Sequence, residues 1–142
     1  MSTVLTRRVG NAGVGLAILR VVVGAIFIAH GGQKLFGLWG GPGLQGVVGM
    51  MGPIGYLVSI GEFFGGLGII CGVLSRFSAF WLIVIMLGAI FKVHLANGFF
   101  LGPKPGFEYA LALIGLAAVI LIAGPGNYAA INMLPRRHPL AE

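Results

Sequence analysis

The stretch Ile54–Leu74, IGYLVSIGEFFGGLGIICGVL, decides the fold of this chain. It is apolar and has the length of about 20 residues that a helix needs to cross a bilayer. Near its middle stands Glu62, although the whole chain has only three acidic residues. A carboxylate at that depth is costly unless it is paired, protonated or next to water. Glu62 therefore needs a partner from another membrane helix.

The overall composition indicates that lipid is the solvent of the chain. Of its 142 residues, 58% are hydrophobic and 8% are charged, whereas about 25% of the residues in a soluble domain are charged. Three further apolar stretches, at about residues 12–35, 77–96 and 107–123, are also long enough to span a membrane. The alternation of barrel strands is absent. The sequence therefore predicts an all-α fold, an integral membrane four-helix bundle.

The basic residues predict the topology of this bundle. The side that both termini share holds Arg7, Arg8, Arg76, Arg136 and Arg137. The other side holds Lys34 and Lys104. This asymmetry predicts a multi-pass protein of the plasma membrane with both termini in the cytoplasm. It also accounts for most of the net charge of +6, so we expect a lipid bilayer and no nucleic acid as partner.

The expected spans divide the chain into three parts. Residues 1–11 form a cytoplasmic N-terminal segment, residues 12–126 the four-span domain, and residues 127–142 a cytoplasmic tail. Within the second span, the four residues Gly61, Gly65, Gly68 and Gly72 form one helical stripe. Because small residues allow close helix contact, the stripe predicts packing inside the bundle, in a larger membrane complex or in a homo-oligomer.

The ionisable residues fall into two groups when their depth is counted at about 1.5 Å per residue from the cytoplasmic side. Arg20 lies at about 10 Å and Glu62 at about 18 Å. We therefore predict that Arg20 and Glu62 form a structural polar pair. An outer band, at about 25 Å or slightly beyond, holds His30, Lys34, Lys92, His94 and Glu108.

Several ordered motifs resemble those of the DoxX family of small four-helix membrane proteins. They are the run from Arg20 to Gly24, the run HGGQKL at 30–35, GEFFGGL at 61–67 and GVLSR at 72–76. His94, Glu108 and the GPG sequence at 124–126 complete the pattern. Here Asn127 to Asn132 replaces the family's Ser-Leu-Asp-like ending. Related DoxD-type proteins include a subunit of thiosulfate:quinone oxidoreductase, so the resemblance implies a link to quinone chemistry.

From this resemblance and the outer band, we expect an accessory or quinone-interacting subunit of a membrane oxidoreductase complex. His30, Lys34 and His94 are the candidate quinone contacts, and Glu62 and Glu108 the candidate proton relay. If the chain is part of an enzyme, it is at most a subunit without its own redox centre, so a partner or bound cofactor supplies the electrons.

Three alternatives stay open at this point. The first is a non-catalytic assembly subunit in which the polar residues fix the helix register. Intramembrane carboxylates and histidines also occur in small proton-coupled permeases, but broken helices and inverted repeats are missing. The third is a haem bound between His30 and His94; apart from that alternative, we expect no metal site.

Overall fold

The computed structural model describes residues 2–133, with side chains from residue 11 onward. Within this part the chain has no strand and five α-helices, which are α1 (Ser2–Phe36), α2 (Gly43–Met51), α3 (Ile54–Cys71), α4 (Ser75–Ala89) and α5 (Glu108–Ala123). A π-helical turn, Ile90–His94, and a 3-10 turn, Leu95–Asn97, continue α4. Short 3-10 turns also occur at Leu38–Gly40 and Ala130–Met133. The all-α class is confirmed, but the helix count is five and not four.

The additional helix, α2, lies in the glycine-rich stretch between the first two predicted spans, where no helix was predicted. It starts after Pro42 and ends at Gly52, whose φ of 68° stops the helix. Val47 is the residue that α2 buries, and it packs against Gly55 at the start of α3. The sequence of α2 does not predict a helix, because the helix contains several glycines and glycine has a low helix propensity. Packing on α1 and α3 supplies the stability that local propensity does not.

Three of the four predicted spans correspond to helices that are long enough to cross a membrane, and the fourth helix is shorter. Three stretches are long and apolar enough to cross a membrane, Asn11–Phe36, Ile54–Cys71 and Ser75–Asn97. The fourth, α5, has 16 residues and is about 24 Å long, so the fourth crossing stays a prediction. No helix break separates residues 2–11 from the first span, because α1 runs through them. Of the predicted tail, residues 134–142 lie outside the described part.

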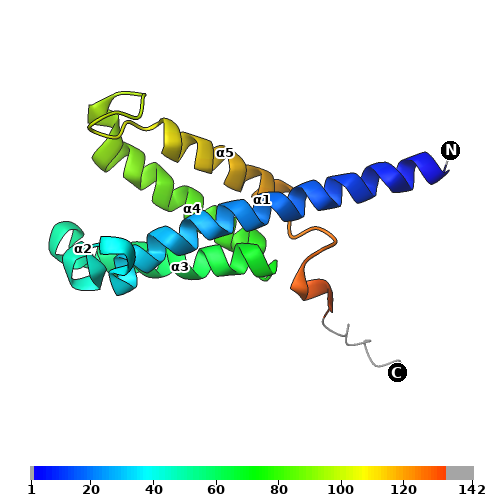
Figure 1. Cartoon of the computed structure of the whole chain (residues 1–142), viewed down its shortest axis with the longest axis horizontal. Coiled ribbons are helices and arrows are strands. Elements are labelled where there is room, and N and C mark those ends of the chain that lie inside the picture. The colour runs from blue at the N-terminus through cyan, green and yellow to red at the C-terminus, as the bar shows by residue number, and fades with distance from the viewer. Residues whose placement is uncertain (1, 134–142) are drawn as a thin grey trace, which may run out of the picture.

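The long helices form two pairs that meet at one end. Helix α1 packs mainly on α3, and α4 packs mainly on α5. Figure 1 shows that the pairs converge where α3 ends and α4 begins, which we call the closed end. They diverge toward α2 and the loop at residues 98–107, which we call the open end (Figure 1). The residues of the outer band, which the sequence singled out as candidates, belong to the open end.

Close contacts of glycines hold α1 against α3. A Cβ added at Gly31 would lie 2.6 Å from the Cα of Phe63, and one added at Gly24 would lie 2.7 Å from the carbonyl oxygen of Gly66. These distances are shorter than any real Cβ contact, so the two backbones meet where only glycine fits. Small residues bring membrane helices together in this manner, through close packing and not through hydrophobic exclusion from water.

Three glycines of the α3 stripe, Gly61, Gly65 and Gly68, contact α4 within the same chain. A Cβ at Gly65 would lie 3.2 Å from Leu82, and one at Gly68 would lie 2.5 Å from the hydroxyl of Ser78. Gly72 ends α3 in the left-handed conformation, with φ of 74°. The stripe therefore serves the internal packing that the sequence also allowed. Gly61, Gly65 and Gly68 are half-buried and also line an apolar groove between α3 and α4, so the expected contact of the stripe with another subunit stays a prediction.

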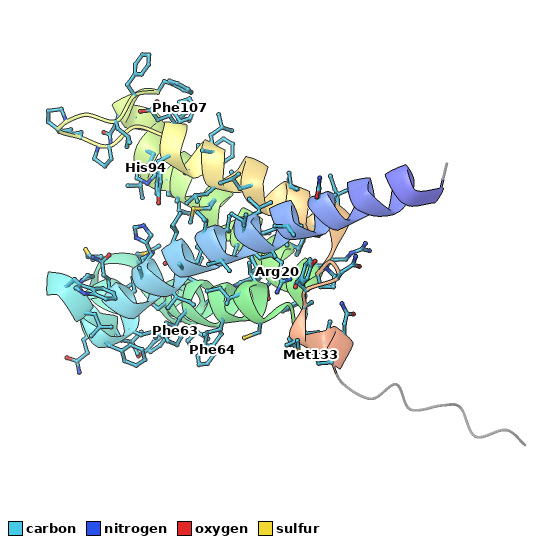
Figure 2. The ribbon with its side chains drawn as sticks, turned by 45° about the vertical axis from the view of Figure 1, so that its right-hand side comes forward. Arg20, Phe63, Phe64, His94, Phe107 and Met133 are labelled. Atoms are coloured by element: carbon cyan, nitrogen blue, oxygen red, sulfur yellow. The ribbon has the colours of Figure 1, made fainter. Side chains whose placement is uncertain are left out.

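Arg20 joins three chain segments at the closed end. Its guanidinium donates to the carbonyls of Ile69 (2.8 Å) and Ile70 (2.6 Å), the last turn of α3. It also donates to the carbonyls of Pro125 (2.6 Å) and Tyr128 (3.2 Å), after α5. Arg20 is only 3% exposed, and Figure 2 shows it where α1 crosses these segments. A cation at a helix C-terminus also interacts favourably with the helix dipole.

The predicted Arg20–Glu62 pair is therefore wrong. Depth alone suggested that Arg20 would reach toward the carboxylate. The last carbonyls of α3 have no partner within the helix, and lipid offers them none. The five fixed N–H donors of a guanidinium match several such carbonyls at once, so Arg20 points to the closed end.

We expect Arg20→Lys to destabilise the protein strongly, because one ammonium group has three donors and cannot reproduce the planar arrangement of four bonds. The free energy of unfolding, measured by denaturant titration in detergent, should fall by about 3 kcal/mol. The matched control is Arg76→Lys, since Arg76 is exposed and makes one bond of 3.2 Å to the carbonyl of Ile122. It should change stability by less than about 0.5 kcal/mol. Equal effects of the two variants would contradict the assigned role of Arg20.

A second prediction concerns the α1–α3 contact. Gly31→Ala places a methyl group against the backbone of Phe63, so the helices must separate and the midpoint of thermal unfolding should fall by several degrees. Gly15→Ala, on the same helix, meets nothing within 4 Å and should leave the midpoint unchanged. A Gly31→Ala protein as stable as the Gly15→Ala control would show that α1 and α3 do not approach this closely.

Candidate functional site

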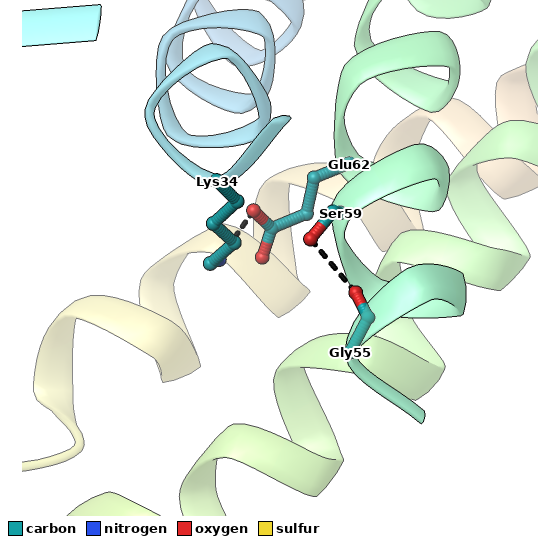
Figure 3. A network of polar contacts seen from close by, with 4 residues as sticks. All are labelled: Lys34, Gly55, Ser59 and Glu62. Atoms are coloured by element: carbon teal, nitrogen blue, oxygen red, sulfur yellow. Dashed lines mark hydrogen bonds and ion pairs between the residues drawn. The ribbon is translucent and has the colours of Figure 1, made fainter. Parts of the chain in front are cut away.

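Glu62 has its ionic partner at the open end. The Lys34 ammonium group, near the end of α1, forms a hydrogen-bonded ion pair with Oε2 of Glu62 on α3 (Figure 3). The Glu62 side chain is 2% exposed and that of Lys34 is 26% exposed. One turn away on α3, the Ser59 hydroxyl donates to the carbonyl of Gly55 at 2.7 Å and is satisfied within its own helix. The pair therefore places two opposite charges between α1 and α3.

The ion pair lies beside a cavity of about 150 Å³, which we call the histidine cavity. It extends between the two helix pairs and beneath the loop at residues 98–107. Its lining consists of Phe27, His30, Lys34, Glu62, Met86, Ala89, His94, Leu101, Pro105, Gly106, Tyr109, Ala110 and Leu113. The structure thus brings together four residues that the sequence singled out, His30, Lys34, Glu62 and His94.

A second cavity, of about 340 Å³, lies on the other side of the same ion pair. We call it the tryptophan cavity, because Trp81 lines it. The two cavities share Lys34, Glu62, Ala89 and His94. The Lys92 side chain is exposed and also lines the tryptophan cavity. Its other lining residues are mostly apolar and come from α2, α3 and α4.

His94 is held in one tautomer by the loop. Its Nδ1 lies 3.0 Å from the carbonyl oxygen of Pro105, and a carbonyl can only accept, so Nδ1 carries a proton. In the neutral ring, Nε2 is then the unprotonated nitrogen that can accept a proton. Asn97 donates to the same carbonyl at 3.1 Å. His94 therefore lines the cavities with a fixed ring that is able to exchange a proton through Nε2.

His30 lines the opposite wall of the histidine cavity. Its ring centre lies 6.3 Å from that of Tyr109, with the planes tilted by 55°. The two residues come from α1 and α5, which belong to different helix pairs. No signal in the sequence distinguished Tyr109 as a cavity residue.

Glu108 has a different position from the other candidates. Its Oε1 accepts a hydrogen bond of 2.6 Å from the backbone N–H of Leu101, and it lines neither cavity. Gly106 reinforces the same loop, because a Cβ there would lie 2.5 Å from the carbonyl oxygens of Gly98 and Phe100. Glu108 thus shapes the loop that covers the histidine cavity, and its predicted part in a proton relay has no geometric support.

The cavities suit an organic ligand better than a metal ion. In the part of the chain that the structure describes, no group of three His, Cys, Asp or Glu side chains could hold a metal. The polar side chains of the histidine cavity, those of His30, Lys34, Glu62, His94 and Tyr109, instead surround a small space whose other walls are mostly apolar. Few polar groups in a mostly apolar pocket are typical of small-molecule sites.

The fold and the site define the class as a helical membrane protein with polar residues gathered between its helix pairs. A sequence model of the DoxX family matches residues 15–95, which is more than half of the chain and includes His30, Lys34, Glu62 and His94. The chain belongs to the DoxX family. The matched part ends before α5, so Glu108 and Tyr109 lie outside it.

One curated relative adds a functional indication. The chain is 29% identical over 103 residues to the Bacillus subtilis (strain 168) protein described as "Putative oxidoreductase CatD". The alignment covers 72% of this chain and 75% of that protein. No solved structure matches the chain significantly.

A double-mutant cycle should detect the Lys34–Glu62 pair. Lys34→Met and Glu62→Gln should each lower the free energy of unfolding by about 2 kcal/mol, because each leaves the partner's polar group unpaired in a partly buried position. The double variant should lose at least about 1 kcal/mol less than the sum of the single losses. Arg20→Met combined with Glu62→Gln is the matched control and should be additive within about 0.5 kcal/mol. Coupling in the control, but not in the Lys34 cycle, would restore Arg20 as the partner.

Proposed function

We propose that the histidine cavity binds the ring of a quinone, and that the protein is an accessory, quinone-interacting subunit of a membrane oxidoreductase complex. The observation that carries this proposal is the convergence of His30, Lys34 and His94 on one cavity beside the buried carboxylate of Glu62. The family membership and the name of the Bacillus subtilis relative support the link to redox chemistry.

The size of the cavity suits one ring. Its volume is about 150 Å³, and an apolar protein cavity of about that volume accommodates a benzene molecule. Phe27, Met86 and Leu113 supply apolar walls. Lys34 and the histidines supply the hydrogen-bonding groups that the two ring oxygens of a quinone require.

The side chains also suit the proton exchange of a quinone. A quinone takes up two protons and two electrons when it becomes a quinol. His94 accepts a proton at Nε2 from a quinol hydroxyl, or donates one from that nitrogen when the ring is protonated. Lys34 donates a hydrogen bond to a ring oxygen and stabilises negative charge on it. Glu62 keeps Lys34 in place and is the nearest carboxylate for a proton relay.

The proposed setting is a complex in the plasma membrane, with both termini in the cytoplasm. A partner or a bound cofactor supplies the electrons, since the amino-acid side chains themselves provide proton exchange and binding. Arg76 lies at the closed end, while Lys34 and Lys104 lie toward the open end. The distribution of basic residues therefore favours a cytoplasmic closed end.

Binding can be tested by fluorescence, because Trp39→Phe leaves Trp81 as the single tryptophan. Trp81 lines the neighbouring cavity, so a tail-less benzoquinone should quench it saturably in nanodiscs. In that background, Lys34→Met and His94→Ala should each raise the dissociation constant at least about tenfold, which corresponds to about 1.4 kcal/mol.

The matched control is Lys104→Met, because Lys104 is exposed and lines neither cavity. It should bind the quinone as the parent does. Quenching that is linear in quinone concentration, or equal in all variants, would contradict the proposed site. If no variant binds quinone, yet all of them assemble normally into their complex, the non-catalytic assembly role is the better account.

A further inference from the structure

The tryptophan cavity adjoins the histidine cavity at the Lys34–Glu62 ion pair. Four lining residues, Lys34, Glu62, Ala89 and His94, belong to both. Lys34, Glu62 and His94 supply polar groups where the two cavities meet, and Ala89 contributes only a methyl group. Beyond the boundary the space is more than twice as large and its walls are mainly aliphatic, from Ile54, Val58 and Val84 among others.

The tryptophan cavity also reaches the outer surface of the bundle. Ile54, Leu57 and Val84 line it, and they are 49%, 55% and 42% exposed. In a membrane protein, exposed aliphatic side chains at this level face lipid. A chain that enters the cavity from the ion pair can therefore leave between α3 and α4 into the hydrocarbon of the bilayer.

We propose that the tryptophan cavity holds the first part of the isoprenoid tail of a quinone whose ring lies in the histidine cavity. This inference rests on the proposed function, and it defines the ligand class as tailed membrane quinones. Their polar ring and long apolar tail match a small polar space joined to a larger apolar one. The groove between α1 and α5, lined by Leu16 and Val119, has no comparable polar neighbour.

Gly88 allows the tail site to be tested apart from the ring site. It lines the tryptophan cavity and not the histidine cavity. A Cβ at Gly88 meets nothing within 4 Å, so a larger side chain can start there without a clash, and we expect that of leucine to occupy part of the cavity. The matched control is Gly115→Leu, since Gly115 is also an exposed helical glycine with nothing within 4 Å and lines neither cavity.

The experiment compares two probes in nanodiscs, a benzoquinone with two isoprene units and the same ring without a tail. Each dissociation constant is expressed as the mole ratio of quinone to lipid in the nanodisc. The different partition of the two probes into the bilayer then does not affect the comparison. Gly88→Leu should weaken binding of the tailed quinone at least about tenfold and leave binding of the tail-less ring unchanged. Gly115→Leu should bind both probes as the parent protein does.

Three results would overturn the inference. Unchanged binding of the tailed quinone by Gly88→Leu would show that the tail lies elsewhere, and an equal loss of both probes would show a general disturbance of the site. If neither probe binds the parent protein, the proposed function fails together with this inference.

As an independent measurement, a tailed quinone with a photoreactive group on its first isoprene unit should label α3 or α4 peptides around Ile54 or Val84. Labelling confined to α1 or α5 would contradict the tail site.

Discussion

The bonds from the Arg20 guanidinium to four backbone carbonyls are the constraint on which the rest of this structure depends. They tie the last turn of α3 and the segment after α5 to the middle of α1. In lipid these carbonyls have no water to bind, so each must be satisfied within the protein. By fixing one end of both helix pairs, Arg20 leaves the pairs free to diverge at the other end, where the cavities form.

The requirement that buried polar groups find partners within the protein also explains the arrangement of the open end. A buried carboxylate needs a cation, and Lys34 reaches Glu62 from the neighbouring helix. Because the glycine contacts bring the α1 and α3 backbones together, a lysine on one helix can pair with a glutamate on the other. The pair then forms the boundary between two cavities of different character, one rich in hydrogen-bonding groups and one mainly apolar. A ligand with a polar ring and an apolar tail matches this division.

The sequence predicted the all-helical class and four of the residues that line the histidine cavity, because apolar length and the depth of rare ionisable groups are local properties. It failed for Arg20, since depth shows that two charges are near the same level but not that free carbonyls at a helix end compete for one of them. It also failed for α2, whose glycines conceal a helix that is stabilised by tertiary packing. The loop position of Glu108 and the contact of Tyr109 with His30 depend on how α5 meets the other helices, which no short motif encodes.

Quinone binding at the open end of the bundle can be measured directly. The most direct measurement is extraction of the protein, purified from its native membrane in mild detergent, with organic solvent, followed by quantification of quinone. The account predicts about one tailed quinone per chain in the parent protein and a clear loss in Lys34→Met, with Lys104→Met as the unchanged control. Absence of quinone from the parent protein, or equal amounts in the Lys34→Met variant, would contradict it.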